Sequence, residues 1–128
     1  MKGFIFRCNE KTKDEVFKRT LFGEEKMYLP IVKSIQTDDM LFLFDLTTYG
    51  FSGPYKPTSM GAEGIEASAW KAAFPAQIRF EITAETKTVP FRLIEKIIKK
   101  YHKGMYPDMV LDEEQVGKVL KVLIQQYI

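Results

Sequence analysis

The chain has 128 residues, of which 45% are hydrophobic and 28% charged, a composition typical of one globular domain that buries its own core. With 19 basic and 17 acidic residues the formal net charge is +2, so the total charge does not by itself indicate a polyanion partner. The single cysteine, Cys8, excludes an internal disulfide and a cysteine-based zinc site, and no apolar run is long enough to span a membrane. We therefore expect a single cytoplasmic domain over residues 1–128, without membrane contact, metal or cofactor.

The N-terminal segment is expected to form a strand followed by a helix. Residues Gly3–Cys8 are apolar and aromatic without helical spacing, which predicts a short buried strand. Thr12 stands three residues before Glu15, the spacing of a capping box, and Gly23 is a suitable residue for a helix end. The sequence therefore predicts an amphipathic helix from about Lys13 to Phe22.

A β-hairpin is expected next along the chain. Residues Tyr28–Ile35 are apolar but contain Pro30, which favours an irregular or short strand segment. Met40–Leu46 is a continuous apolar run of the kind found in strands covered on both faces. Phe51–Ser59 returns as the second arm, where Gly53 and two prolines indicate a bulged or edge strand. We expect this hairpin at the centre of the sheet.

The third quarter of the chain predicts a short helical segment and a further strand. The alanines of Ile65–Phe74 allow one or two helical turns that end before Pro75. Residues Gln77–Ala84 alternate between apolar and polar side chains, which predicts a strand with one buried face. The apolar side chains expected on that face are Ile78, Phe80 and Ile82.

Two helices are expected at the C-terminal end. The first runs from Pro90 to about Tyr101 and the second from Asp112 to Tyr127, with Asp112 and Gln115 as a cap. The inward side chains of the first helix are Leu93, Ile94, Ile97 and Ile98. Those of the second helix are Val116, Val119, Leu120, Leu123 and Ile124.

Charge is segregated within this C-terminal part. Basic residues dominate from Arg92 to Lys103, whereas Asp108–Glu114 is acidic. Polyanion binding depends on such clustering, although a solvated face would have the same pattern. The candidate phosphate contacts are Arg92, Lys96, Lys99, Lys100 and Lys103.

The pattern of reactive residues argues against catalysis. His102 is the only histidine, and Cys8 lies in a predicted buried strand where cysteine is usually an inert small hydrophobe. No phosphate-binding glycine loop, zinc motif or calcium loop occurs. We therefore expect a binding domain and not an enzyme.

Aromatic residues are the remaining candidates for ligand contacts. The chain has 10 Phe, 6 Tyr and 1 Trp, and aromatic faces next to cations are used to stack unpaired bases. Most of these rings are expected in the core. Trp70, on a short helical segment after a glycine-containing loop, is the ring expected to line a cleft.

Seven short segments resemble, in the same order and spacing, the DCD (development and cell death) domain. The resemblance covers roughly Gly3 to Leu93 and does not include the C-terminal helix. The segments are GFIFRCN, LFG at Leu21–Gly23, YLPIVKSI, LFLFDLTT, TSMG, AW at Ala69–Trp70 and FPAQIRF at Phe74–Phe80. This resemblance implies an α+β fold of the PUA-like group, which includes EVE and YTH domains: a bent, barrel-like β-sheet with flanking helices and a pocket on one side.

The resemblance to YTH domains also implies a ligand: RNA, or a nucleotide-like molecule whose base is held between aromatic walls. Leu21 or Phe22 would form the first wall, Trp70 the second, and Asn9 would make a polar contact. Arg79 and the basic stretch would meet phosphates. Because the first wall is not tryptophan here, the base can differ from the methylated adenine of YTH domains. Stacking contributes about 1–3 kcal/mol per base, so a Trp70→Ala change is expected to weaken RNA binding.

A protein-interaction or dimerisation module is the alternative from a different class. It would use the apolar face of the C-terminal helix together with Tyr101, Tyr106 and Tyr127. A homodimer or a protein partner would then replace RNA as the ligand.

Overall fold

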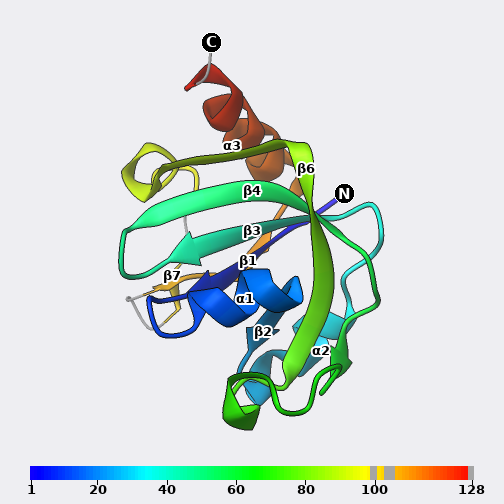
Figure 1. Cartoon of the computed structure of the whole chain (residues 1–128). Coiled ribbons are helices and arrows are strands. Elements are labelled where there is room, and N and C mark those ends of the chain that lie inside the picture. The colour runs from blue at the N-terminus through cyan, green and yellow to red at the C-terminus, as the bar shows by residue number, and fades with distance from the viewer. Residues whose placement is uncertain (99–100, 103–105, 127–128) are drawn as a thin grey trace.

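The computed structural model describes the backbone of residues 1–98, 101–102 and 106–126, and the side chains of residues 1–98 and 108–126. A mixed sheet with the strand order β2-β6-β4-β3-β1-β9 forms the centre of the molecule (Figure 1). Strands β1 and β3 are parallel, and the other pairs are antiparallel. The strands are β1 (Gly3–Cys8), β2 (Leu21–Glu24), β3 (Met40–Asp45), β4 (Gly50–Pro57), β5 (Ala62–Glu63), β6 (Ala76–Pro90) and β9 (Val110–Leu111), with β7 (Tyr101–His102) and β8 (Tyr106–Pro107) as a separate pair.

Helices flank this sheet on more than one side. Helix α1 crosses in front of the sheet in Figure 1, and α3 lies at the end where β6 finishes. The α-helices are α1 (Lys13–Arg19), α2 (Leu29–Lys33) and α3 (Glu113–Gln125), and the 3-10 helices are η1 (Lys26–Tyr28), η2 (Ala69–Ala72) and η3 (Phe91–Leu93).

The sheet curls because β6 serves two groups of partners. Its first residues pair with β2 and β5, and the rest pair with β4 along two stretches separated by a register shift between Gly53 and Tyr55. A bulge of this kind bends a strand and increases its twist. As a result β1 and β2, which are distant in strand order, approach each other, and the rings of Phe6 and Phe22 stack with centroids 4.9 Å apart. The predicted α+β fold with a bent sheet and flanking helices is confirmed.

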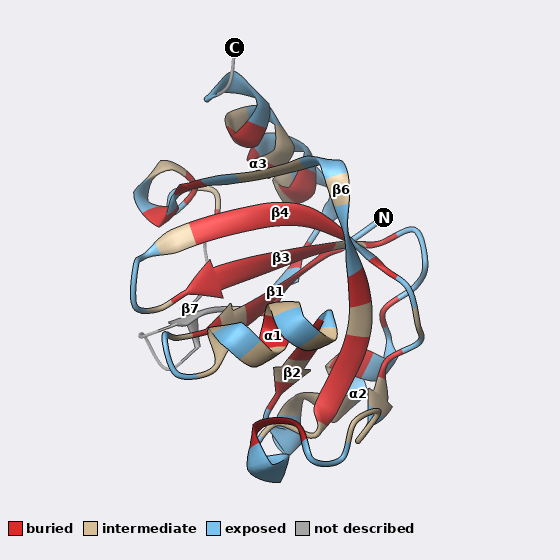
Figure 2. Cartoon of the chain, in the orientation of Figure 1, coloured by how far each residue is buried: buried red, intermediate tan, exposed pale blue. Residues whose placement is uncertain are grey.

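The buried residues lie along the strands and on part of α3, as the red segments of Figure 2 show. Their side chains form two clusters on the two sides of the curled sheet. The first cluster lies between α1 and the strands and includes Phe6, Phe22, Phe80 and Trp70. The second includes Phe42, Phe44 and Phe91 together with α3 residues. The two sides of the sheet therefore have separate cores, which is important for placing the candidate site.

Several predicted elements are confirmed. Strand β1 matches the predicted residues, and β3 and β4 form a hairpin in the middle of the strand order with an irregular register. Helix α3 begins after Asp112, whose carboxylate accepts a hydrogen bond from the Gln115 N–H at 2.8 Å, and this capping box is reciprocal. Within the part that the structure describes, no helix is long and apolar enough to cross a membrane.

The predicted helix over Lys13–Phe22 is too long. Helix α1 ends at Arg19, and Thr20 takes a left-handed conformation with φ 46°. Leu21 then enters β2, because the following residues pair with β6. The capping-box prediction is also wrong, since the Thr12 side chain makes no cap hydrogen bond to the helix.

Two further segments differ in type. Residues Leu29–Lys33 are helical, and Pro30 sits in the first turn, where a missing N–H has no cost. Residues 90–98, the described part of the predicted helix up to the first gap, form no α-helix: η3 is followed by tight turns, with the Ile97 N–H donating to the carbonyl of Ile94. The predicted inward positions Ile82 and Ile124 are exposed, at 61% and 58% of their surface.

Candidate nucleic-acid interface

The predicted first wall of the pocket, Leu21 and Phe22, has no exposed surface. The Phe22 ring is stacked between Phe6 and Phe80, with the Phe80 centroid 4.0 Å away. Leu21 belongs to the same core cluster. The prediction that these side chains form an open wall is wrong, because both are fully buried in the core.

Trp70 is also buried, with only 6% of its surface exposed. Its indole Nε1–H donates to the carbonyl oxygen of Thr12 at 3.0 Å, and its backbone N–H donates to Glu15 Oε1 at 3.0 Å. The indole and the Phe74 ring are nearly perpendicular, with centroids 5.9 Å apart, and a Cβ built on Gly23 would come within 2.5 Å of Trp70 Cζ3. The indole therefore lies directly on Gly23 and offers no free face to a ligand.

The backbone that carries the indole has an unusual conformation. Trp70, Lys71 and Ala72 all have positive φ, at 49°, 53° and 67°. Left-handed geometry costs a non-glycine residue roughly 1–2 kcal/mol. Because three consecutive residues carry this cost, the contacts of Trp70 with its surroundings must offset the strain of all three.

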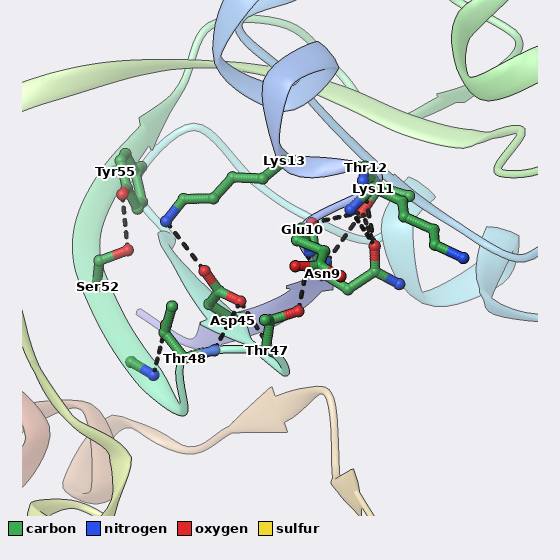
Figure 3. Close-up of polar contacts among 11 residues, drawn as sticks. Asn9, Glu10, Lys11, Thr12, Lys13, Asp45, Thr47, Thr48, Ser52 and Tyr55 are labelled. Atoms are coloured by element: carbon green, nitrogen blue, oxygen red, sulfur yellow. Dashed lines mark hydrogen bonds and ion pairs between the residues drawn. The ribbon is translucent and has the colours of Figure 1, made fainter.

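Asn9, the predicted polar contact, lines a cavity of about 200 Å³, which we call the Asn9 pocket. Asn9 Oδ1 accepts from the backbone N–H groups of Lys11 and Thr12 at 2.9 and 3.1 Å (Figure 3). The neighbouring Glu10 N–H donates to Thr47 Oγ1 at 2.9 Å, which ties this loop to the β3–β4 turn. The pocket is lined by Arg7, Cys8, Asn9, Thr12, Gly23, Glu24, Glu25, Leu46 and Phe74.

The loop geometry leaves one polar group of Asn9 available. Both backbone donors are bonded to Oδ1, so the amide nitrogen Nδ2 is left as the donor of this side chain, and it has no partner among the described residues. Phe74, which is half-buried, supplies an aromatic surface to the same pocket. The arrangement suits a flat, polar-edged ligand.

A buried ion pair forms the wall between β1 and β2. Arg7 Nη2 donates to Glu24 Oε2 at 2.8 Å, and Arg7 Nε and its backbone N–H both donate to Glu24 Oε1. The guanidinium also lies over the Tyr28 ring, 5.3 Å from its centroid. Burial raises the pKa of Glu24, while the hydrogen bonds from Arg7 act in the opposite direction. The pair links β1 to β2 beside the Asn9 pocket, where the curled sheet brings these two strands together. We call this junction the seam of the sheet.

The Cys8 thiol, which lines this pocket, is buried. Burial, together with the nearby Asp45 carboxylate, raises the pKa of Cys8 to about 12. Asp45 itself accepts from Lys13 Nζ at 3.0 Å and from the Thr47 N–H at 2.9 Å (Figure 3). The described residues contain no group of His, Cys, Asp and Glu side chains placed to hold a metal ion.

Arg79 does not reach the Asn9 pocket. Its Nη1 donates to the Arg19 carbonyl at 3.0 Å and pairs with Glu66 Oε2 at 2.9 Å. Arg19 pairs with the same carboxylate, and these two guanidinium groups hold the pKa of Glu66 below its usual range. The predicted phosphate contact instead secures the loop before η2.

The described part of the predicted basic stretch, with Arg92 and Lys96, lies away from the pocket. Arg92 and Lys96 are exposed, but they flank Phe91 and Ile94, which belong to the second core cluster. In Figure 1 η3, drawn in yellow-green, lies far from the green turn of η2. Lys99, Lys100 and Lys103 lie outside the described residues.

A cation that was not predicted is closer to the pocket. Lys11 is exposed and directly follows the Asn9 loop, and its side chain extends away from that loop in Figure 3. The other residues that sequence reasoning missed are Thr12, Gly23 and Phe74, which meet only in the folded chain. The alternation of side chains along β2 could have indicated Gly23, because it lies on the opposite face of the strand from Phe22.

The predicted dimer surface is used within the chain. The apolar residues Val116, Val119 and Leu123 of α3 are buried in the second core cluster. The side chains of Tyr101, Tyr106 and Tyr127 lie outside the described residues. The apolar face of α3 is therefore not free for a partner.

The fold is that of the YTH domains. The chain matches a crystal structure of the Mmi1 YTH domain with a TM-score of 0.70, 14% identity and coverage of 98% of this chain and 97% of the other. A Mmi1 YTH domain in complex with RNA gives 0.67, with 14% identity and coverage of 95% and 80%. A Toxoplasma CPSF4 YTH domain in complex with an m6A-modified RNA gives 0.66, with 11% identity and coverage of 97% and 91%.

The chain belongs to the Development and cell death domain family, which it matches over residues 2–123. It is 37% identical to the DCD domain-containing protein NRP-B of Glycine max over 91 residues, which is 66% of this chain and 27% of that protein. It is 36% identical to the B2 protein of Daucus carota over 84 residues, 60% of this chain and 41% of that protein. The chain thus spans less than half the length of these curated relatives.

Proposed function

We propose that this domain binds single-stranded RNA without catalysing a reaction, and that one base enters the Asn9 pocket. The observation that carries the proposal is the similarity of nearly the whole chain to YTH domains, among them domains solved in complex with RNA. The Asn9 pocket supports it, because it combines an unused amide donor with an aromatic surface. Unpaired bases are recognised by such edges and rings.

The charges of the pocket favour a base over a phosphate. Arg7 is neutralised by Glu24, and Glu25 adds a further carboxylate at the rim. A phosphate would be repelled there, whereas the N–H groups of a base edge would find acceptors. The RNA backbone would then run outside the pocket, where exposed Lys11 meets it.

The contact from Asn9 is tested with a nearly isosteric change. Asn9→Asp keeps the oxygen that accepts from Lys11 and Thr12 but removes the Nδ2 donor. Losing one hydrogen bond and adding a charge should weaken binding of a labelled single-stranded RNA about tenfold or more, as measured by fluorescence anisotropy. Unchanged affinity, with unchanged thermal stability, would exclude Asn9 from the site.

The path of the RNA backbone is tested with a matched pair of lysines. Lys11→Ala should weaken binding and reduce the salt dependence of the affinity by about one counterion. Lys96→Ala removes an equal charge at the other end of the molecule and should change neither. Weaker binding by Lys96→Ala with unchanged binding by Lys11→Ala would place the interface at the predicted basic stretch. If the domain binds no RNA at all, the proposed function is refuted.

A further inference from the structure

We infer that the Trp70 indole is an internal substitute for a purine base. In the free domain the indole occupies the space that the base would take, which we call the base slot, and it is displaced when RNA binds. The inference rests on the proposed function and extends it to the ligand class and to the state of the empty site. It starts from the fact that the buried indole and the Asn9 pocket share a wall.

Three residues form that shared wall. The Thr12 carbonyl accepts from the indole N–H, Gly23 lies against the six-membered ring, and the Phe74 ring packs nearly perpendicular to the indole. The same three residues line the Asn9 pocket. If the indole leaves, its space therefore becomes continuous with the cavity of about 200 Å³ next to it.

The shape of the occupied slot indicates which base fits. An indole is a flat fused bicycle whose ring N–H donates to the Thr12 carbonyl at 3.0 Å. A purine is also a flat fused bicycle and has amino or ring N–H groups that can donate to the same oxygen. A pyrimidine has one ring and would leave part of the slot empty, which sacrifices packing contacts.

The backbone of η2 makes the displacement feasible. Trp70, Lys71 and Ala72 are all left-handed in the closed state, which is unfavourable at each residue. The indole contacts and the hydrogen bonds to Thr12 and Glu15 tie this turn to α1, and the turn also has backbone hydrogen bonds of its own. Release of the turn relieves the strain, so a base that replaces the indole contacts shifts the population to the open state.

The indole itself reports the displacement, because Trp70 is the only tryptophan of the chain. Acrylamide quenching of its fluorescence should be weak in the free domain. Saturating oligoadenylate should increase the quenching to the level of an exposed tryptophan, and oligouridylate should not. RNA binding with unchanged quenching would overturn the inference but leave the proposed function intact, and equal exposure by both RNAs would overturn the purine assignment.

A matched pair at position 71 tests the strain without altering the indole. Lys71→Gly relieves the left-handed cost in the closed state, whereas Lys71→Ala removes the same side chain and retains the cost. A more stable closed state competes better with RNA, although the flexibility of glycine in the open state partly offsets this stabilisation. The glycine variant should therefore bind oligoadenylate about threefold more weakly than the alanine variant. Equal or tighter binding by the glycine variant would contradict a closed state held against strain.

A wild-type domain that binds no RNA would refute the proposed function as it stands, and Trp70→Ala would then decide the inference. Binding of oligoadenylate by that variant alone would mean that the indole blocks the slot. If neither protein binds, both proposals are wrong.

Discussion

Gly23 is the residue beneath the indole, and the space for its Cβ is already taken by Trp70. A methyl group there would overlap the indole, since the Cβ would lie 2.5 Å from Cζ3. Gly23→Ala should therefore push the ring outward, lower the free energy of unfolding by about 1–3 kcal/mol and shift the tryptophan emission to longer wavelength without RNA. Urea unfolding and emission spectra measure both effects.

Gly64→Ala is the contrasting variant. No atom lies within 4 Å of a Cβ at that position, so the variant would add only the backbone strain of a φ of 63° and would not touch the indole. An unshifted spectrum in Gly23→Ala would mean that the indole position is not fixed by this contact.

Cys8 is a second residue whose surroundings set its behaviour. Because burial raises the pKa of the thiol to about 12, it stays protonated near neutral pH. We expect Ellman's reagent to leave the native domain unlabelled at pH 8 and to label one thiol after denaturation. Rapid labelling of the folded protein would show that the Asn9 pocket is more open than described.

At the scale of elements, the ion pair between β1 and β2 holds the seam of the sheet. Both side chains are largely buried, and Glu24 also accepts from the backbone N–H of Arg7. Glu24→Ala would leave a buried guanidinium without its partner, so the free energy of unfolding should fall by about 3–5 kcal/mol. The exposed pair of Glu114 and Lys118 on α3 is the control, and Glu114→Ala should cost about 0.5 kcal/mol or less. Similar losses in the two variants would contradict a structural role for the seam.

The elements that the sequence predicted well are those with a strong local pattern. The continuous apolar run of β3, the aromatic run of β1 and the cap of α3 all need only neighbouring residues. Strand β2 was assigned to a helix because its strand character comes from pairing with β6, whose residues lie far along the chain. The segment after Pro90 has helical spacing, yet its residues close tight turns over the second core cluster.

The candidate site was predictable only in part for the same reason. Asn9 follows a recognisable strand and does line a pocket. Trp70 was expected to be open, but its bonds to Thr12 and Glu15 join residues more than fifty positions apart. No local pattern marks such contacts, nor the separation of Arg92 and Lys96 from the pocket.

For the whole molecule, two carboxylates link stability to pH. Lys13 and the N–H groups of Thr47 and Thr48 lower the pKa of Asp45 despite its burial, and Arg19 and Arg79 lower the pKa of Glu66. A lowered pKa in the folded state means that the unfolded chain binds protons more readily. The stabilisation is therefore complete above the ordinary carboxyl pKa of about 4 and is lost as the pH falls through the lowered values.

We accordingly expect the thermal midpoint to fall steeply below about pH 4. Asp45→Asn should be less stable at neutral pH and should lose less on acidification than the wild type. Calorimetry over this pH range measures both. Parallel curves for the two proteins would show that Asp45 does not contribute to the acid dependence.

The central claim is that one RNA base is held at the Asn9 pocket. Its most direct test is a titration of the isotopically labelled domain with oligoadenylate, followed by amide chemical shifts. The amides of Asn9, Thr12, Gly23 and Phe74 should move together and saturate with the affinity seen by anisotropy, while those of α3 stay unchanged. Shifts confined to residues 91–98 and α3, with the pocket amides unaffected, would contradict it.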